Sequence, residues 1–252
     1  MLVEKELNVS RAWMIAHDTD SISLDKWQKL QQLAQRRLNG EPMAYIIGSR
    51  EFMGLEFDVS PAVLIPRPDT ETLVETALSF LKNKSCPKVL DLGTGSGAII
   101  VSLAHYGSAI QACASDISLE ALAISKKNAE KFKLKINFQQ SNWFKQWQGQ
   151  RFDLIVSNPP YIHKDDKHLQ QGDLRFEPQI ALTDFEDGLS CYRTLISQTP
   201  QYLAQGGGLF VEHGWDQAEA VRQLLVEAGF EQVHSVKDLA GIERVSGGLL
   251  PN

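Results

Sequence analysis

The chain has 252 residues, of which 43% are hydrophobic and 22% charged, as is usual for a soluble globular enzyme with one large domain and a smaller one. Its net charge is −6 at pH 7. Residues 1–50 hold 7 basic and 6 acidic groups (+1), which leaves −7 on the rest and argues against a nucleic-acid-binding surface. Cys86, Cys113 and Cys191 lack metal-like spacing, and the N-terminus does not resemble a secretory signal, so we expect a cytoplasmic protein with no metal site and no membrane segment.

The first part of the chain predicts a small helical arm followed by a hairpin. Apolar residues recur at helical spacing through residues 1–44, with Asn39-Gly40 as a helix stop. In residues 45–66, β-branched and aromatic residues are interrupted by turn-forming positions such as Gly54 and Pro61, which predicts a β-hairpin linker. The remainder, residues 67–252, is expected to form the main domain.

The main domain is predicted to alternate strands and helices. A helix capped by Asp69 or Thr70 runs through Leu81, Pro200 should end or kink a later helix, and Gly206-Gly207-Gly208 should turn into the next strand. Such alternation implies a doubly wound parallel sheet in an α/β fold. The strands are predicted near 88–92, 110–115, 136–141, 152–157, 208–212 and 231–236, and the helices near 97–105, 118–132, 189–204 and 216–228.

A glycine-rich loop follows the first strand of this domain. Gly93-Thr94-Gly95-Ser96-Gly97 precedes a helical run, and glycines there let backbone N–H groups approach a ligand closely. The spacing differs from the dinucleotide fingerprint, and Asp91 stands where a carboxylate could meet a cationic amino group. Together these features fit the methionine end of S-adenosylmethionine better than NAD.

Asp116 ends the next predicted strand, 19 residues past Gly97. A carboxylate at a strand end can accept hydrogen bonds from both ribose hydroxyls of a nucleoside. The alternative interpretation is that Asp116 caps the following helix.

The tetrad Asn158-Pro159-Pro160-Tyr161 follows the apolar strand 152–157. Ligands bind open α/β sheets at the carboxyl ends of their strands, and two prolines remove two backbone donors while leaving the carbonyls free to accept. Such a site suits a substrate that is itself an NH2 group. The alternative is an Asx-Pro turn that closes the strand.

Four segments together resemble the peptide chain release factor glutamine methyltransferases. The resemblance covers roughly residues 25–245. It implies a Rossmann-like class I S-adenosylmethionine-dependent methyltransferase with S-adenosylmethionine as cofactor, which methylates the side-chain amide nitrogen of the glutamine in the Gly-Gly-Gln motif of release factors. We expect a monomer with release factors as partners and no nucleic acid or membrane partner. The segments are Ile65–Glu71, Asp91–Gly97, Asn158–Tyr161 and Asp173–Pro178.

The site residues are assigned by combining the resemblance with this chemistry. The Asn158 side-chain oxygen and the Pro159 carbonyl accept the two substrate N–H groups, and Tyr161 packs its ring on the flat amide. Trp143 follows the third strand, where the family places an acid and an aromatic residue near adenine; the acid position here is Asn142, which leaves the adenine contact open. The substrate set is Asn158, Pro159, Pro160 and Tyr161, and the cofactor set is Gly93, Thr94, Gly95, Ser96, Gly97, Asp116, Asn142, Trp143 and Asn158.

Two departures and two alternative functions stay open. Family members carry a longer arm ahead of the position matching Leu2, so the arm is expected to be shortened here, by a mis-assigned start or by truncation. The ending Val245–Asn252 also departs from the family's, which leaves the last strand open. The tetrad could present acceptors to an adenine or guanine amino group, which would require a basic groove and a target-recognition domain. The chain could also be a non-catalytic remnant that binds S-adenosylmethionine.

Overall fold

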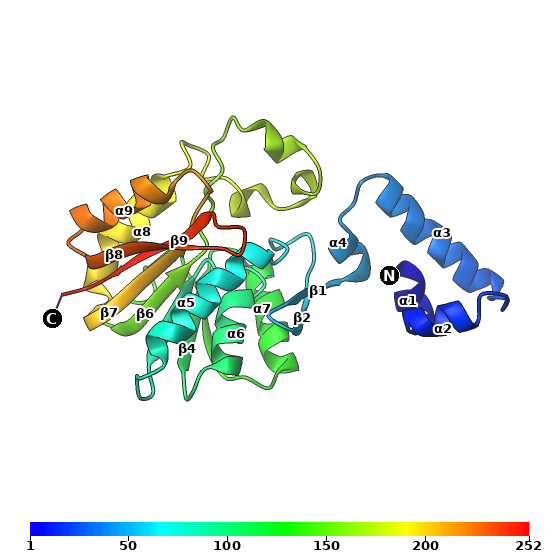
Figure 1. Cartoon of the computed structure of the whole chain (residues 1–252), viewed down its shortest axis with the longest axis horizontal. Coiled ribbons are helices and arrows are strands. Elements are labelled where there is room, and N and C mark those ends of the chain that lie inside the picture. Colours follow the sequence, from blue (N-terminus) through cyan, green and yellow to red (C-terminus); the bar gives the residue numbers. More distant parts are fainter. Residues whose placement is uncertain (252) are drawn as a thin grey trace.

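The computed structural model describes residues 1–251 as an α/β body with a helical arm at one end (Figure 1). The arm is joined to the body through a short helix and a two-stranded antiparallel hairpin. Helix α4 buries Tyr45 and Ile46, so the start of the segment predicted as a hairpin is helical, and the hairpin itself is shorter than 45–66. These elements are α1 (Leu2–Leu7), α2 (Arg11–Ala16), α3 (Leu24–Leu38), α4 (Met43–Ile47), β1 (Ser49–Phe52) and β2 (Leu55–Asp58).

Within residues 1–251, seven strands form the central sheet in the order β5-β4-β3-β6-β7-β9-β8. The pairs from β5 to β7 are parallel, whereas β9 runs antiparallel to β7 and to β8. The sheet is therefore mixed, which corrects the prediction of a parallel sheet. The strands are β3 (Lys88–Leu92), β4 (Gln111–Asp116), β5 (Ile136–Gln140), β6 (Phe152–Ser157), β7 (Leu203–Glu212), β8 (Glu231–Lys237) and β9 (Glu243–Leu249).

Helices cover both faces of the sheet, and successive strand residues divide between two cores. In β3, Val89 packs in the core under α5 and α6, while Leu90 packs in the core under α8 and α9. None of the helices in residues 1–251 combines the length and the apolarity needed to cross a membrane. The helices of this domain are α5 (Glu71–Leu81), α6 (Ala98–Tyr106), α7 (Leu119–Lys131), α8 (Ser190–Gln198) and α9 (Ala218–Glu227).

Most predicted elements of the main domain are confirmed, with two corrections near the C-terminus. Helix α8 ends before a 3-10 turn that contains Pro200, as predicted. Strand β7 begins at Leu203, so Gly206-Gly207-Gly208 lies inside the strand, where its pairing with β6 shifts register. The prediction of a turn at these glycines is wrong because the irregular pairing accommodates them within the sheet. Strand β9 was left open by the sequence; the structure inserts it between β7 and β8 (Figure 1).

The glycines of β9 explain how the strand fits there. A Cβ on Gly247 would lie 2.1 Å from Phe210 Cδ1 and 2.4 Å from the Leu209 carbonyl oxygen. We expect Gly247→Ala to lower the free energy of unfolding by about 3 kcal/mol, since a backbone oxygen cannot move aside cheaply. The measurement is chemical denaturation.

Gly149→Ala is the control for this substitution. A Cβ there meets nothing within 4 Å, but φ is +74°, so the expected loss is only about 1 kcal/mol. Equal losses in the two variants would show that the close approach at Gly247 does not matter to stability.

Candidate active site

A cavity of about 500 Å³ opens at the carboxyl ends of β3, β4 and β6. Its size suits a nucleoside-sized ligand with part of a second molecule. The structure brings most of the residues predicted for the cofactor and the substrate to this cavity. These are Gly93, Thr94, Gly95, Ser96, Asp116, Asn142, Trp143, Asn158 and Pro160.

The glycine loop Gly93–Gly97 has a backbone that side chains rarely allow. Gly93, Gly95 and Gly97 all have positive φ, at 73°, 54° and 83°. A Cβ on either of the first two would meet no atom within 4 Å, so their backbone borders the open space of the cavity. At Gly97 a Cβ would approach the Ser125 Cβ of α7 at 3.0 Å, so the structure places this glycine against α7.

The N–H groups of this loop mostly bind the protein itself. Those of Gly93 and Thr94 donate to the Ser115 carbonyl at 2.9 and 3.0 Å, and that of Gly95 donates to Asp116 Oδ2 at 2.9 Å. The expectation that these donors face a ligand is wrong, because they fasten the loop to the end of β4. What the loop offers a ligand is close approach and a defined shape.

Asp116 fastens the loop with one oxygen and lines the cavity. Its Oδ1 accepts from the Ser118 N–H at 2.9 Å, while the Ser118 hydroxyl caps α7 by accepting from Ala121 N at 3.1 Å. Asp116 is therefore not the cap of this helix. Burial raises the pKa of the Asp116 carboxyl, and the N–H donors of Ser118 and Gly95 oppose that rise.

Asp91 lies behind the loop, fully buried. The Thr94 hydroxyl donates to Oδ2 at 2.7 Å, and Oδ1 has no hydrogen-bond partner among the described residues. Burial raises the pKa of Asp91 to about 7, opposed by the Thr94 hydrogen bond and reinforced by the charge of Asp116. Asp91 does not line the cavity, whereas Thr94, which donates to it, does, so the structure does not show Asp91 at the cavity, where the sequence suggested that it could meet a ligand's amino group.

Asn142 and Trp143 form another part of the wall, after β5. Trp143 has a positive φ of 49°, and its carbonyl accepts from the Ser141 hydroxyl at 2.7 Å. Asn142 is exposed and Trp143 half-buried, which places an amide and an indole side by side on the cavity.

The tetrad presents only part of itself to the cavity. Asn158 and Pro160 line it and are partly exposed, while Pro159 is buried. The Asn158 Nδ2 donates to the Thr70 Oγ1 at 3.3 Å, so its Oδ1 is directed away from Thr70. This amide orientation leaves an oxygen acceptor available to an NH2 group.

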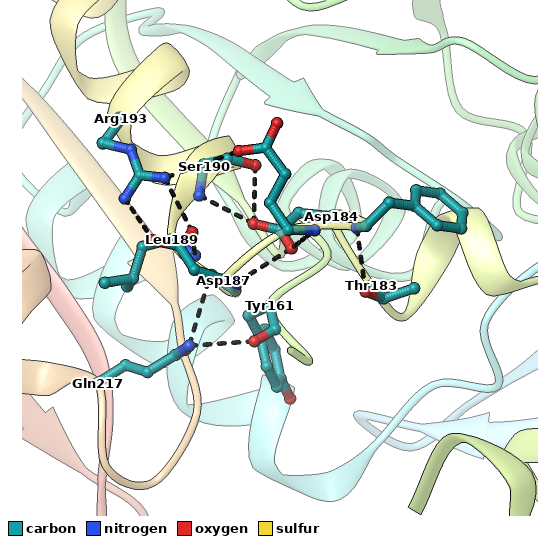
Figure 2. Close-up of polar contacts among 11 residues, drawn as sticks. Tyr161, Thr183, Asp184, Asp187, Leu189, Ser190, Arg193 and Gln217 are labelled. Carbon is teal, nitrogen blue, oxygen red and sulfur yellow. Dashed lines mark hydrogen bonds and ion pairs between the residues drawn. The ribbon is translucent and has the colours of Figure 1, made fainter. Parts of the chain in front are cut away.

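Tyr161 points the other way. Its ring packs against the core under α8 and α9, and its hydroxyl donates to Glu212 Oε1 at 3.5 Å. The Tyr161 carbonyl accepts from Gln217 Nε2 at 3.0 Å, as Figure 2 shows. The sequence predicted that this ring packs on the substrate amide, whereas in the structure it packs against the core and does not line the cavity.

A turn held by Asp184 forms part of the cavity wall, and Figure 2 shows the hydrogen bonds that hold this turn. Its carboxylate accepts from the N–H groups of Gly188 and Ser190 at 3.0 and 2.9 Å and from the Ser190 hydroxyl at 2.7 Å. Burial works against the charge, but these donors together lower the pKa of Asp184. The turn presents the exposed ring of Phe185 at the cavity and contacts the tetrad through Gln217, which also donates to the Gly188 carbonyl at 3.2 Å.

Two segments distant in sequence meet at the cavity through Arg67 and Glu177. The fully buried Glu177 carboxylate pairs with Arg67 and accepts from the Ile65 N–H at 3.0 Å. Arg67 lines the cavity, while Arg175 donates to the Asn39 carbonyl at 3.1 Å, at the end of α3. The two arginines thus have separate surroundings, one at the cavity and one at the arm.

Several site residues were not assigned from the sequence. Thr70 and Asp184 line the cavity, while the buried Glu177 and Glu212 contact Arg67 and Tyr161. The sequence signal that could have indicated such a residue is an acid directly after an apolar run, as at Glu212. One sequence does not distinguish such an acid from a surface residue at a strand end.

Comparison with known proteins assigns the chain to a family. Residues 1–48 match the PrmC N-terminal domain model, and residues 69–174 match the Methyltransferase small domain model. The release factor glutamine methyltransferase of Bordetella pertussis is 53% identical over 251 residues, covering 99% of this chain and 93% of that protein. The protein of the same name from Neisseria gonorrhoeae is 49% identical, covering 98% and 91%.

Solved structures confirm the fold. The crystal structure of a methyltransferase from Pyrococcus furiosus has a TM-score of 0.58 and 17% identity, covering 88% of this chain and all of that one. The expectation of a class I methyltransferase fold is therefore correct, with β9 as the antiparallel strand of its mixed sheet. With two relatives near half identity over almost their whole lengths, the chain belongs to the release factor glutamine methyltransferase family.

Proposed function

We propose that this protein transfers a methyl group from S-adenosylmethionine to the side-chain amide nitrogen of the glutamine in the Gly-Gly-Gln motif of peptide chain release factors. The observation that carries the proposal is that Asn158 and the glycine loop share one cavity. The names of the relatives give the substrate class. A substrate held by Asn158 and a cofactor on the glycine loop would therefore share one space, as direct transfer requires.

The cavity fits S-adenosylmethionine by its shape and its donor set. Gly93 and Gly95 leave room where any side chain would intrude, and Asp116 offers a carboxylate oxygen to hydroxyl donors. Asn142 and Trp143 border the same space, with an amide and a flat aromatic surface for a base. The cofactor supplies a methyl group activated by a positive sulfur.

The protein's own contribution is to orient a weak nucleophile. An amide nitrogen has a delocalised lone pair, and orientation alone can supply roughly 7–11 kcal/mol in favourable cases. Asn158 Oδ1 and the Pro159 carbonyl accept the two N–H groups of the substrate, which fixes the NH2 plane and favours positive charge that develops on nitrogen. Pro160 forms the cavity wall beside them, and the Tyr161 ring anchors the tetrad to the core.

The organisation that goes with this function has three parts. Residues 1–44 form the arm that receives the release factor, residues 45–66 the linker, and residues 67–252 the methyltransferase domain. The protein acts as a monomer in the cytoplasm, without binding nucleic acid directly. The net charge of −6 and three free cysteines support these proposals.

The test is methyl transfer from labelled S-adenosylmethionine. We expect label on a folded release factor and none on DNA or ribosomal RNA. A release factor with glutamate in place of the motif's glutamine should stay unlabelled, because it lacks the NH2 group and brings a negative charge to the acceptors of Asn158 and Pro159. Label on nucleic acid alone would overturn the proposal in favour of an amino-nucleobase substrate, and cofactor binding without transfer to either would indicate a non-catalytic protein.

A further inference from the structure

Glu212 lies beside Asn158 at the carboxyl edge of the sheet. Ser157 pairs with Val211 in the parallel ladder between β6 and β7, so the next residue of each strand is adjacent to the other. Glu212 is 1% exposed, whereas Asn158 reaches the cavity. A buried acid thus stands directly behind the residue that accepts the substrate amide in the proposed function.

The hydrogen bonds around this carboxylate leave one acceptor open. The Tyr161 hydroxyl donates to Oε1 at 3.5 Å, and Oε2 has no hydrogen-bond partner in residues 1–251. Nearby, the Thr70 hydroxyl oxygen accepts from Asn158 Nδ2 at 3.3 Å, so the Thr70 proton is available for another acceptor. Thr70 is itself 5% exposed, and a buried hydroxyl is usually hydrogen-bonded within the protein or to an ordered water.

The direction of these hydrogen bonds follows from the charge on Glu212. An ionised carboxylate only accepts, so a neighbouring hydroxyl must donate its single proton to it. Thr70 can then only accept from Asn158, which requires the NH2 end of that amide to face Thr70. We propose that Glu212 is a positioning residue, which through Thr70 holds the Asn158 amide with its nitrogen toward the protein and its oxygen toward the substrate.

The surroundings of Glu212 make its charge sensitive to pH. Burial raises the pKa of its carboxyl to about 7. Hydrogen bonding from the Thr70 side chain opposes this rise, the charge of Asp69 adds to it, and the charge of Arg244 and hydrogen bonding from the Asn158 side chain oppose it. Arg244 also pairs with Asp69 at 3.3 Å. Burial also moves the pKa of three neighbours away from neutral pH toward their uncharged forms: it raises the pKa of Tyr161 and Tyr192 and lowers that of His213.

Protonation of Glu212 should therefore free the Asn158 amide from this orientation. A protonated carboxyl can donate to Thr70, which then can donate to the oxygen of Asn158 and favour the opposite amide orientation. Glu212→Gln imitates this state at every pH, with almost no change in shape. Since the folded pKa lies above the unfolded value of about 4.5, the charge lowers stability as pH rises toward 7, and removing it should leave thermal stability at about pH 8 equal or higher.

The first test uses the ligand-free protein and does not depend on the proposed function. The side-chain NH2 signals of Asn158, identified by their loss in Asn158→Ala, should move in the 15N–1H spectrum as pH passes through about 7. In Glu212→Gln the same signals should stay constant over that range. If the Asn158 signals of the wild type did not change with pH over this range, the proposal would be overturned.

The second test is kinetic and rests on the proposed function. At about pH 8 and saturating S-adenosylmethionine, Glu212→Gln should lower kcat about tenfold with cofactor affinity unchanged within about twofold. The ratio of wild-type kcat to Glu212→Gln kcat should fall toward one at about pH 6, where Glu212 is protonated. Asp91, whose pKa burial also raises to about 7, is present in both proteins and does not contribute to this ratio.

Thr70 provides the matched variants. Thr70→Val should lower kcat about as much as Glu212→Gln, the double variant should be no worse than either, and Thr70→Ser should regain most of the loss because it keeps the hydroxyl. A constant ratio of wild-type to Glu212→Gln kcat across pH, or additive losses in the double variant, would overturn the role of Glu212. A wild-type protein that does not methylate release factors would instead contradict the proposed function, and the spectra would still decide the inference.

Discussion

Replacing Asn158 by alanine should lower kcat for release factor methylation about 100- to 1000-fold, the range seen when one preorganised polar group is removed from a transition-state site. The side-chain oxygen of Asn158 is the acceptor that the structure directs away from Thr70. Without it, a substrate N–H has no partner in a partly desolvated site, at a cost of about 1–3 kcal/mol, and the amide plane is no longer held. The measurement is single-turnover transfer at saturating S-adenosylmethionine.

Asn142→Ala is the matched control for this loss. The residue is the same type and lines the same cavity, but on the side of Trp143, so its removal should act on cofactor affinity while kcat at saturation changes far less. Calorimetry should find near-normal S-adenosylmethionine binding in Asn158→Ala. Near-normal turnover in Asn158→Ala, or equal kcat losses in both variants, would contradict the role given to the tetrad.

Asp116→Ala should weaken S-adenosylmethionine binding about 10- to 100-fold. Charge-assisted hydrogen bonds from hydroxyl groups contribute roughly 1.5–3 kcal/mol. The structure adds a second cause, because the same carboxylate holds the Gly95 N–H at 2.9 Å and the Ser118 N–H at 2.9 Å. Its loss removes both the ligand's acceptor and the fastening of the glycine loop. Calorimetric titration with S-adenosylmethionine measures the change.

Asp116→Asn separates these two causes. The asparagine amide is uncharged; it keeps one oxygen that can accept from the loop but has an NH2 donor in place of the second oxygen. The affinity for S-adenosylmethionine should therefore be intermediate between wild type and Asp116→Ala. Thermal unfolding of each variant shows whether the loop or the whole domain has been affected. An unchanged dissociation constant in a folded Asp116→Ala protein would mean that the carboxylate acts only on the loop and does not contact the ligand.

The sequence by itself was sufficient for the elements whose signals are local. Strands β3 and β6 are short, mainly apolar segments with turn residues at their ends, and the structure places them at the predicted bounds. The glycine loop and the tetrad were recognised because their chemistry depends on residue type and short spacing. Since parallel strands end at one edge of a sheet, these motifs were also bound to meet there, and they do.

The tertiary structure decided the features that depend on which segments become neighbours. Strand β9 is glycine-rich and lacks an apolar pattern; it is a strand through its pairing with β7 and β8, where Gly247 leaves space for Phe210. The Tyr161 ring packs against the core, where the residues it contacts come from distant segments. The N–H groups of the glycine loop bind Ser115 and Asp116, which belong to the neighbouring strand β4.

Glu212 shows the same division most clearly. In sequence it is an acid after an apolar strand, with no short-range partner that would give it a role. Only the pairing of β6 with β7 sets it beside Asn158, and only the packing of the 3-10 turn before α5 brings the Thr70 hydroxyl within 3.3 Å of Asn158 Nδ2. Local pattern thus determines what a segment is, whereas the direction of a hydrogen bond between distant residues exists only once the fold has brought them together.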